Sequence, residues 1–325
     1  MQIETNITPH EIRLASFNVR NLALPGLVYY ENKPPYSIAE YDMKTTWIAG
    51  QLDQSNADVI GLQEIFSPES LADILAKTRH YRNAKHITVE SHSSNLPKSP
   101  NVALISRLPI VCSPVFHTLL PDNLAVTLPG DNMVIDHFSR PVLHACIRFP
   151  NKTDVHILLA HLKSKKPDYP ENANPATPLM SELGSLRSLI RRGTDALGIR
   201  HLVSNLRNIN QTPLIVMGDF NDFAFAASTQ IIIGESETIG APSPNRLYNC
   251  FEIQSGISYD EKNSLFFPGT DIPRIDHILV SKEFTAQSGF KLGKVRNVRY
   301  FNHHLGKDRP EISDHGLVMA TIQLK

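Results

Sequence analysis

The sequence is poor in cysteine. Cys112, Cys146 and Cys250 are the only three among 325 residues, and none are spaced as Cys-x-x-Cys. An odd count without that spacing argues against a disulfide framework and against a zinc–thiolate site. We therefore expect buried free thiols, because unpaired cysteine behaves as a small apolar residue.

Long apolar segments are also lacking. The N-terminal segment MQIETNITPHEIR has no apolar stretch typical of a signal peptide, and no run approaches the roughly 18 apolar residues of a membrane-spanning helix. The sequence therefore predicts a cytoplasmic protein without a membrane span. A chain from which a leader had been removed would look the same.

Neither sign of charge is in excess. Lys and Arg number 32, and Asp and Glu also number 32. A protein that coats nucleic acid through bulk charge would be basic overall, so that class is excluded, whereas a local basic groove is not. Hydrophobic residues make up 41% and charged residues 20%, which excludes disordered and fibrous proteins.

Domain organisation follows from the absence of any dividing segment. At ~150 residues per domain the length would allow two domains. No internal repeat, low-complexity tract or linker separates them, so we expect one compact domain over residues 1–325, taken to be a monomer.

Short apolar runs bounded by turn residues predict many strands and few helices. The expected strands cover residues 12–19, 57–64, 86–90, 101–106, 110–116, 141–149, 154–161, 212–222, 274–281 and 314–324. Helical spacing is found at 43–52, after Pro68, and over about 180–209, where Gly193 and Gly198 weaken the prediction of one unbroken helix. The Pro-rich segment 166–178 must be a loop. This order favours layered α/β with mixed sheets.

Polar residues stand at the ends of several of these apolar runs, where α/β folds usually bind ligands. They are Asn18, Glu64, His161, Asp219, Asn221, Asp276, Asp314 and His315. Each alone is most simply a turn residue or a structural histidine. The set is chemically complementary, however. Carboxylates suit Mg²⁺ or Mn²⁺, histidines can hydrogen-bond or protonate phosphate, and Asp219 could accept a proton from water. The set therefore indicates metal-assisted phosphoester hydrolysis.

Longer segments around these residues follow one another in a recognisable order. They are SFNVRNL (16–22), LQEI (62–65), NVALISRLPIV (101–111), SRPVL (139–143), LLAHLKSK (158–165), PLIVMGDFND (213–222), RIDHILVS (274–281) and SDHGLV (313–318). With these segments the chain resembles the endonuclease/exonuclease/phosphatase superfamily, which includes deoxyribonuclease I, abasic-site endonucleases, neutral sphingomyelinases and inositol polyphosphate 5-phosphatases. The resemblance spans almost the whole chain. It implies a four-layer sandwich of two packed mixed β-sheets flanked by helices.

The resemblance also implies roles for individual residues. Glu64 resembles the principal metal-binding Glu, Asn18 its neighbour in the metal and phosphate shell, and Asp314 a second metal-site acid. Asp219 resembles the residue that orients or deprotonates the attacking water. Asn221, His161 and His315 resemble residues that contact the phosphate. Asp276 resembles the carboxylate that orients His315.

Two positions depart from the superfamily's pattern. Some members carry an acid two residues after the first Asn, where this chain has Arg20, so Arg20 either meets phosphate or pairs with an acid. The HLKSK stretch is followed by the Pro-rich loop, which gives the groove an unusual wall. We expect Arg20, Arg140 and Lys163 to bind phosphate or substrate.

The substrate class is less determined by the sequence. Basic residues follow His161, lie along the helical region at Arg187, Arg191, Arg192, Arg200 and Arg207, and precede the SDH motif at Arg296, Arg299, His303, His304, Lys307 and Arg309. They form either a track for a phosphate backbone or solvated surface charge. Trp47 reads as a core residue. The Tyr/Pro segment 24–37 is the one candidate for apolar substrate contact.

Three functions are therefore considered. The first is a divalent-metal-dependent nuclease that hydrolyses DNA, or another nucleic acid, by in-line attack of water. The second is the same chemistry on a phospholipid head group, a nucleotide or an inositol phosphate. The third, least favoured, is a non-catalytic binding protein on this fold, because every position needed for catalysis is filled.

Overall fold

In this computed structural model the described residues are 11–30, 33–89, 100–170, 177–234, 245–256, 258, 265–267, 270–307 and 309–325. Parts of the Tyr/Pro segment 24–37 and of the Pro-rich segment 166–178 therefore lie outside the described residues, as does the end of the strand expected at 86–90.

One sheet has six strands in the order β13-β14-β1-β2-β4-β3. Its strand β1 is parallel to β2 and antiparallel to β14, so the sheet is mixed. The bounds are β1 Glu11–Leu22, β2 Val59–Ile65, β3 Lys85–Thr88, β4 Asn101–Ser106, β13 Gly293–Phe301 and β14 Leu317–Leu324. We call it sheet A.

The second sheet, sheet B, also has six strands, in the order β11-β12-β10-β9-β8-β5, with β9 and β10 parallel. Its strands are β5 Val115–Leu119, β8 His137–Arg148, β9 Asp154–His161, β10 Leu214–Asp219, β11 Leu247–Asn249 and β12 Asp276–Ser281. A separate hairpin pairs β6 Val126–Thr127 with β7 Val134–Ile135.

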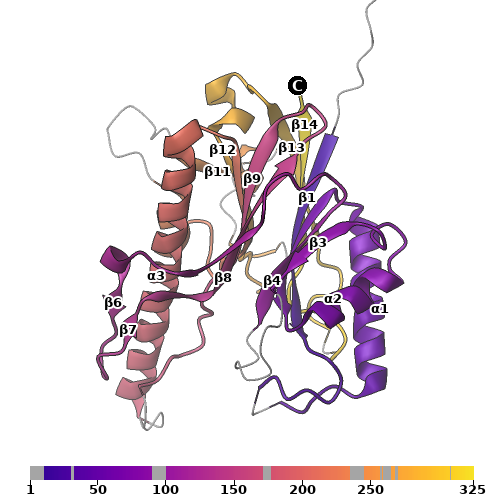
Figure 1. Ribbon diagram of the computed structural model, residues 1–325. Helices are drawn as coiled ribbons and strands as arrows, with labels where there is room; N and C mark the ends of the chain where they lie inside the picture. Colours follow the sequence, from indigo (N-terminus) through magenta and orange to yellow (C-terminus); the bar gives the residue numbers. More distant parts are fainter. Residues whose placement is uncertain are drawn as a thin grey trace, which may run out of the picture.

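Helices cover the outer faces of both sheets (Figure 1). The α-helices are α1 Ile38–Ser55, α2 Pro68–Lys77, α3 Pro178–Asn210, α4 Ala227–Ile233 and α5 Cys250–Ile253, and three 3₁₀ turns are η1 Asp122–Leu124, η2 Lys282–Phe284 and η3 Ala286–Ser288. Helix α1 begins at a capping box, in which the Ser37 side chain accepts from the Glu40 amide and the Glu40 carboxylate accepts from the Ser37 amide.

Strand alternation explains how the layers pack. Inward-facing side chains such as Leu14 and Val59 of sheet A meet Leu143, Ile157 and Met217 of sheet B in one buried cluster. The outward faces form two further clusters, sheet A with α1 and α2, and sheet B with α3 and α4. The four-layer α/β sandwich implied by the sequence is therefore confirmed.

Helix α3 is one unbroken helix of 33 residues despite its internal glycines. Gly198 lies against Leu120 and the Phe138 ring, and a β-carbon there would fall within 2.6 Å of that ring. The glycine thus permits close packing of the helix on sheet B rather than a break. Along the described part of the chain, no helix combines the length and the apolarity needed to cross a membrane.

Two of the three cysteines are not free. Cys112 and Cys146 form a disulfide with Cα atoms 5.4 Å apart, whereas Cys250 is a buried free thiol. The expectation of three free thiols is therefore wrong for this pair. The segment before β5 runs beside β8, where the Val111 amide donates to the Cys146 carbonyl at 2.9 Å. Sequence spacing does not reveal this pairing because the two cysteines are 34 residues apart.

Candidate active site

The ends of strands from both sheets meet at one point. Asn18 lies near the end of β1, and its Nδ2 donates to Glu64 Oε1 at 3.1 Å and to Asp219 Oδ2 at 3.0 Å. Glu64 belongs to sheet A and Asp219 to sheet B, so this one buried amide joins the two sheets. Residues far apart in sequence are thereby held within hydrogen-bonding distance.

Glu64 is held by an irregular backbone. Its φ is 66°, and the register of β2 against both β1 and β4 shifts at this position. A non-glycine residue in this region is strained and is often found at functional sites. The carboxylate is fixed by Asn18 and by the Asn21 amide, which donates to Oε2 at 2.7 Å. Its side chain stays 17% exposed, so the oxygens are fixed but accessible.

Asp219 is the most enclosed acid of the site, with 0% exposure. Besides Asn18, it accepts from the Asn221 amide at 2.8 Å. Burial alone would raise the pKa of this carboxyl, but His315, His161 and Asn18 outweigh burial and hold the pKa below its usual range. Asp219 is therefore ionised at neutral pH. The preceding Gly218 has φ 148°, where a β-carbon would collide with the Ala160 carbonyl.

His315 and Asp276 form a buried dyad. His315 Nδ1 lies 2.8 Å from Asp276 Oδ2, and its Nε2 lies 3.7 Å from Asp219 Oδ2. Burial acts to lower the pKa of His315, but the two carboxylates more than offset it and raise that pKa well above its usual value. Burial raises the pKa of Asp276, and the imidazolium opposes this. The imidazolium form is thus held between two acids.

His161 differs from His315 in its protonation. Its Nε2 lies 3.3 Å from Asp219 Oδ2 and 4.0 Å from Glu64 Oε1. Burial lowers the pKa of His161, and nearby Arg140 adds to this, although the two carboxylates oppose them. A neutral imidazole follows. Its Nδ1 is buried and has no hydrogen-bond partner among the described residues.

Asn221 completes the group around Asp219. Its φ is 53°, a left-handed conformation that asparagine tolerates. The side-chain Nδ2 donates to the Leu162 carbonyl at 3.0 Å and lies 3.3 Å from Asp219 Oδ2. The amide thus rests against Asp219 and remains part-buried at the edge of the site.

The residues expected to contact substrate lie in different places. Arg140 donates from Nη1 to the Leu162 carbonyl at 2.9 Å, and its buried Nε has no partner among the described residues. Lys163 instead donates from Nζ to the Lys166 carbonyl at 2.8 Å. Its part in substrate binding stays a prediction, since the amino group is engaged by its own loop.

Arg20 and Asp314 lie together at the rim. The Arg20 Nε is 3.8 Å from Asp314 Oδ2, and the Asp314 side chain is 62% exposed. Arg20 therefore pairs with an acid, one of the two outcomes expected for it. The role of Asp314 as a metal ligand stays a prediction.

The buried arginines of α3 match neither of the two expectations for this helix, a track for phosphate or solvated surface charge. Arg187, Arg192 and Arg207 are buried, so they are neither a phosphate track nor solvated charge. They form internal ion pairs, with Arg187 Nη1 2.7 Å from Asp131, Arg192 Nε 3.1 Å from Asp222 and Arg207 Nη2 3.0 Å from Glu283. The partners lie far away in sequence, which is why composition of the helix alone did not reveal them.

Other expectations on basic and aromatic residues fare better. Arg296, Arg299 and Lys307 are exposed, and their convergence into a basic surface at the site stays a prediction. Trp47 packs in the core of the α1 layer, with its ring 5.9 Å from that of Phe17, as expected.

Lys44 is a site residue that the sequence reasoning missed. It lies on α1 with 0% exposure, and its Nζ has no hydrogen-bond partner among the described residues. Burial lowers its pKa to about 7, Arg20 adds to this, and Glu64 opposes it. The signal was available, because Tyr41, Lys44 and Ile48 share one face at helical spacing.

The tyrosines of the Tyr/Pro segment form an aromatic group with Phe66. The Tyr29 and Tyr36 rings stack at 5.3 Å, and Tyr29 meets Phe66 edge to face at 5.8 Å. Burial raises the pKa of Tyr30, with further contributions from nearby Glu64 and, in the opposite direction, from Arg140. The described part of the Tyr/Pro segment therefore lies near Glu64 and Arg140, and its contact with substrate stays a prediction.

A divalent cation suits the Glu64 side of the site. Glu64 and Asn18 offer fixed oxygens of the hard type that Mg²⁺ and Mn²⁺ prefer. Asp219, Asp276 and His315 also bring ligand atoms within 4.8 Å of one another. His315 is held as an imidazolium, however, and a protonated imidazole has no lone pair for a metal. The donor chemistry therefore favours Glu64 over the dyad.

Comparison with known proteins agrees with this geometry. The model of the Endonuclease/Exonuclease/phosphatase family matches residues 15–315. The structure is similar to the human Nocturnin catalytic domain with bound sulfate, at 17% identity and TM-score 0.58, covering 97% of this chain and 95% of that one. No curated protein sequence matches the chain.

Two other solved structures share the fold. The Bacteroides thetaiotaomicron mannosyl-6-phosphatase is 17% identical with TM-score 0.56, covering 96% of this chain and 99% of that one. Truncated Caenorhabditis elegans TDP2 is 15% identical with TM-score 0.55, covering 96% and 97%. At such identities the likeness concerns the fold.

Proposed function

The chain belongs to the endonuclease/exonuclease/phosphatase family, and from that premise we propose that it is a divalent-metal-dependent phosphodiester hydrolase acting on DNA. The observation that carries the proposal is the Asn18 amide, which holds Glu64 and Asp219 together at the meeting point of the two sheets. A metal-holding acid and a water-orienting acid are thereby fixed on either side of one small site.

Each residue has a defined task in the proposed reaction. Glu64 and Asn18 would hold the divalent ion, which when bound neutralises phosphate charge. Ionised Asp219 orients water in line with the scissile bond and takes its proton as attack proceeds. Neutral His161 keeps the Asp219 carboxylate in position through Nε2.

Charge that develops on the phosphate is met by the remaining groups. His315, protonated and oriented by Asp276, directs Nε2 towards the space beside Asp219 and would donate to a phosphate oxygen. Arg140 would supply a further donor through Nε, while Asn221 holds Asp219 in place with its side-chain amide. No covalent intermediate is required.

Support for DNA comes from the exposed basic residues on β13 and after it, Arg296, Arg299 and Lys307. The alternative is the same chemistry on a smaller phosphoester. It gains weight from the internal pairing of the α3 arginines, which removes them from any backbone track, and from a fold neighbour that is a mannosyl-6-phosphatase.

The experiment is a metal-dependent activity screen. It compares plasmid DNA, single-stranded DNA, RNA, sphingomyelin, a sugar phosphate and bis(p-nitrophenyl) phosphate, in Mg²⁺, in Mn²⁺ and in excess chelator, with Asp219→Asn as the blank. We expect plasmid cleavage that chelation abolishes and Mg²⁺ or Mn²⁺ restores. Turnover of the small esters alone would reject the nuclease proposal while retaining the hydrolase, and no hydrolysis of any ester would reject both.

A further inference from the structure

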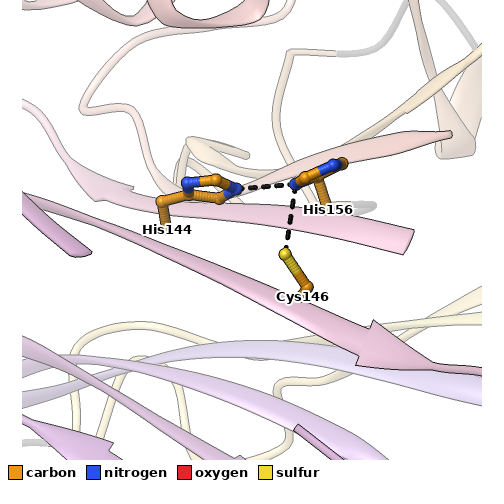
Figure 2. A group of neighbouring side chains, drawn as sticks. All are labelled: His144, Cys146 and His156. Atoms are coloured by element: carbon orange, nitrogen blue, oxygen red, sulfur yellow. Dashed lines mark hydrogen bonds between the residues drawn. The ribbon is translucent and has the colours of Figure 1, made fainter. Parts of the chain in front are cut away.

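A second polar cluster lies on sheet B away from the catalytic residues (Figure 2). It consists of His144 and Cys146 on β8 and His156 on β9. His144 Nε2 is 2.7 Å from His156 Nδ1, and Cys146 Sγ is 3.3 Å from the same nitrogen. Ligand atoms of all three side chains lie within 4.8 Å of one another.

Strand register brings these side chains to one face. His144 and Cys146 are two positions apart on β8, and Cys146 pairs directly with His156 across the ladder. This is the outward face of sheet B, which also carries Val142 and Leu158 of the α3-side core. His161 follows five positions after His156, which puts it about 16 Å further along the strand and on the other face.

Cys112 brings a fourth donor to the cluster. Its sulfur is bonded to that of Cys146. Reduction of this bond would leave two thiols and two imidazoles side by side, and two Cys with two His is a common donor set of tetrahedral zinc sites.

We propose that His144, His156, Cys146 and Cys112 form a zinc site when the two cysteines are reduced, and that the disulfide is the metal-free alternative of the same four residues. Thiolate and imidazole are borderline-soft ligands that select Zn²⁺ over Mg²⁺ or Ca²⁺. This donor set contrasts with the oxygen-rich catalytic centre.

The distances are compatible with a metal after a small rearrangement. With Zn–N near 2.0–2.1 Å and Zn–S near 2.3 Å, tetrahedral ligand atoms are about 3.3–3.8 Å apart. The observed N···N and N···S separations of 2.7 and 3.3 Å are slightly shorter, and the two sulfurs, bonded here, would separate to about 3.8 Å after reduction. His144 and His156 lie half-buried beside each other, and neutral imidazole is the form of histidine that binds metal.

The two states are linked by a balanced exchange. A dithiol reductant transfers two electrons and two protons to the disulfide, which gives two thiols and the cyclic disulfide of the reductant. Zn²⁺ then displaces the two thiol protons and binds the two thiolates. Oxidation by a disulfide of the same class would release the ion and restore the Cys112–Cys146 bond.

The test uses the full chain with Co²⁺ as a spectroscopic substitute for Zn²⁺. Protein is prepared with the disulfide intact or reduced by a dithiol that is then removed, and excess Mg²⁺ is added to occupy oxygen-rich sites. We expect thiolate-to-cobalt charge-transfer bands and tetrahedral d–d bands only in the reduced protein, saturating at one equivalent and displaced by Zn²⁺. Reduced protein without such bands would overturn the proposal.

Variants assign the ligands. Cys146→Ser and His156→Asn should each weaken Co²⁺ binding by more than about 100-fold. Substitution of a residue that only supports a metal ligand already lowers metal affinity by about 10–100-fold, and these two residues are proposed as ligands. Cys250→Ala is the matched control, since this buried thiol is free, and it should leave the bands unchanged. Retention of the bands in Cys146→Ser, or their loss in Cys250→Ala, would contradict the assignment.

A measurement on the wild-type protein tests the proposal even if the variants do not fold. In the reduced wild-type protein, Zn²⁺ should slow the reaction of Cys112 and Cys146 with an aromatic disulfide reagent by at least tenfold. Equal rates with and without Zn²⁺ would overturn the proposal. Both readouts are independent of hydrolysis, so failure of the proposed function would leave them unaffected.

Discussion

Strand β9 carries a histidine in each of two polar clusters, and the two histidines have different surroundings. His161 stands at the end of the strand, between the sheets, with Glu64 and Asp219 as its neighbours. His156 stands near the start, on the outward face, beside His144 and Cys146. The same side chain therefore belongs to a hard, oxygen-rich centre in one place and to a nitrogen–sulfur set in the other.

The comparison teaches that position in the sheet determines the available chemistry. Where strands end between the two sheets, residues from the turns after different strands lie close together. Acids in these turns do not disturb the core. The outward face gathers side chains by register alone, two positions apart on one strand and opposite on the next. Substitutions at the strand ends and on the outward face of sheet B should therefore have different effects, the first on turnover and the second on metal binding or stability.

The largest effect is expected at Asp219. Asp219→Asn keeps the shape but removes the charge that balances His315 and, in the proposed reaction, would receive the water proton, so turnover should fall by about 10²–10⁴-fold. Hydrolysis of bis(p-nitrophenyl) phosphate and the far-ultraviolet circular dichroism spectrum are measured together. Metal binding by the nitrogen–sulfur cluster should be unchanged, and wild-type turnover in a folded variant would contradict the assignment of Asp219.

Arg140 at the candidate site and Arg187 on α3 should affect different properties, turnover in the first case and stability in the second. Arg187 is 1% exposed and lies 2.7 Å from Asp131 and 3.4 Å from Asp168, so Arg187→Met should lower the free energy of unfolding by about 1.5–3 kcal/mol because it removes the cation that pairs with both acids. Arg140→Met should instead lower turnover, by about 100-fold. Denaturant unfolding and initial rates are measured for both variants. The reverse pattern would place Arg140 in the framework of the fold.

The two histidines of β9 give a matched pair. His161→Asn should reduce turnover by roughly tenfold, since it removes the neutral imidazole that holds Asp219. His156→Asn should leave turnover within about twofold, because His156 lies on the outward face of sheet B, five positions from His161. A twofold change corresponds to less than 1 kcal/mol. Steady-state rates at saturating metal decide between them. Equal losses in the two variants would mean that the outward cluster is coupled to catalysis.

At Lys44 the expected effect is on stability, and it depends on pH. The Lys44 pKa is lowered from 10.5 to about 7 in the folded protein, so unfolding takes up a proton between these values and stability rises with pH in that range. At about 1.4 kcal/mol per pKa unit, Lys44→Met should therefore stabilise the protein by up to about 4 kcal/mol at pH 7 and by about 1 kcal/mol or less near pH 10. Unfolding curves at the two pH values measure the difference, with exposed Lys85→Met as the control. A gain that does not depend on pH would show that the lysine is not buried in its charged form.

Much of the fold and the grouping of the candidate site residues could be predicted because the signals are local. The runs that end in Glu64 and Asp219 show both the buried strand and its polar end within about ten residues. Edge strand β13 was missed because its exposed residues interrupt the apolar pattern. The Cys112–Cys146 bond was missed as well, because it depends on a register between distant segments that no spacing rule contains.

The order in which the sheet is assembled has a consequence for biosynthesis. Strand β14 lies between β13 and β1 in sheet A, and the Ser313 hydroxyl donates to the Asn18 carbonyl at 2.6 Å across 295 positions of sequence. During translation, β1 therefore waits for a neighbour that is made last among the strands. A nascent chain would expose one side of β1 until then, and such an unpaired strand edge is prone to aggregation, while release before β14 is made would leave His315 out of position.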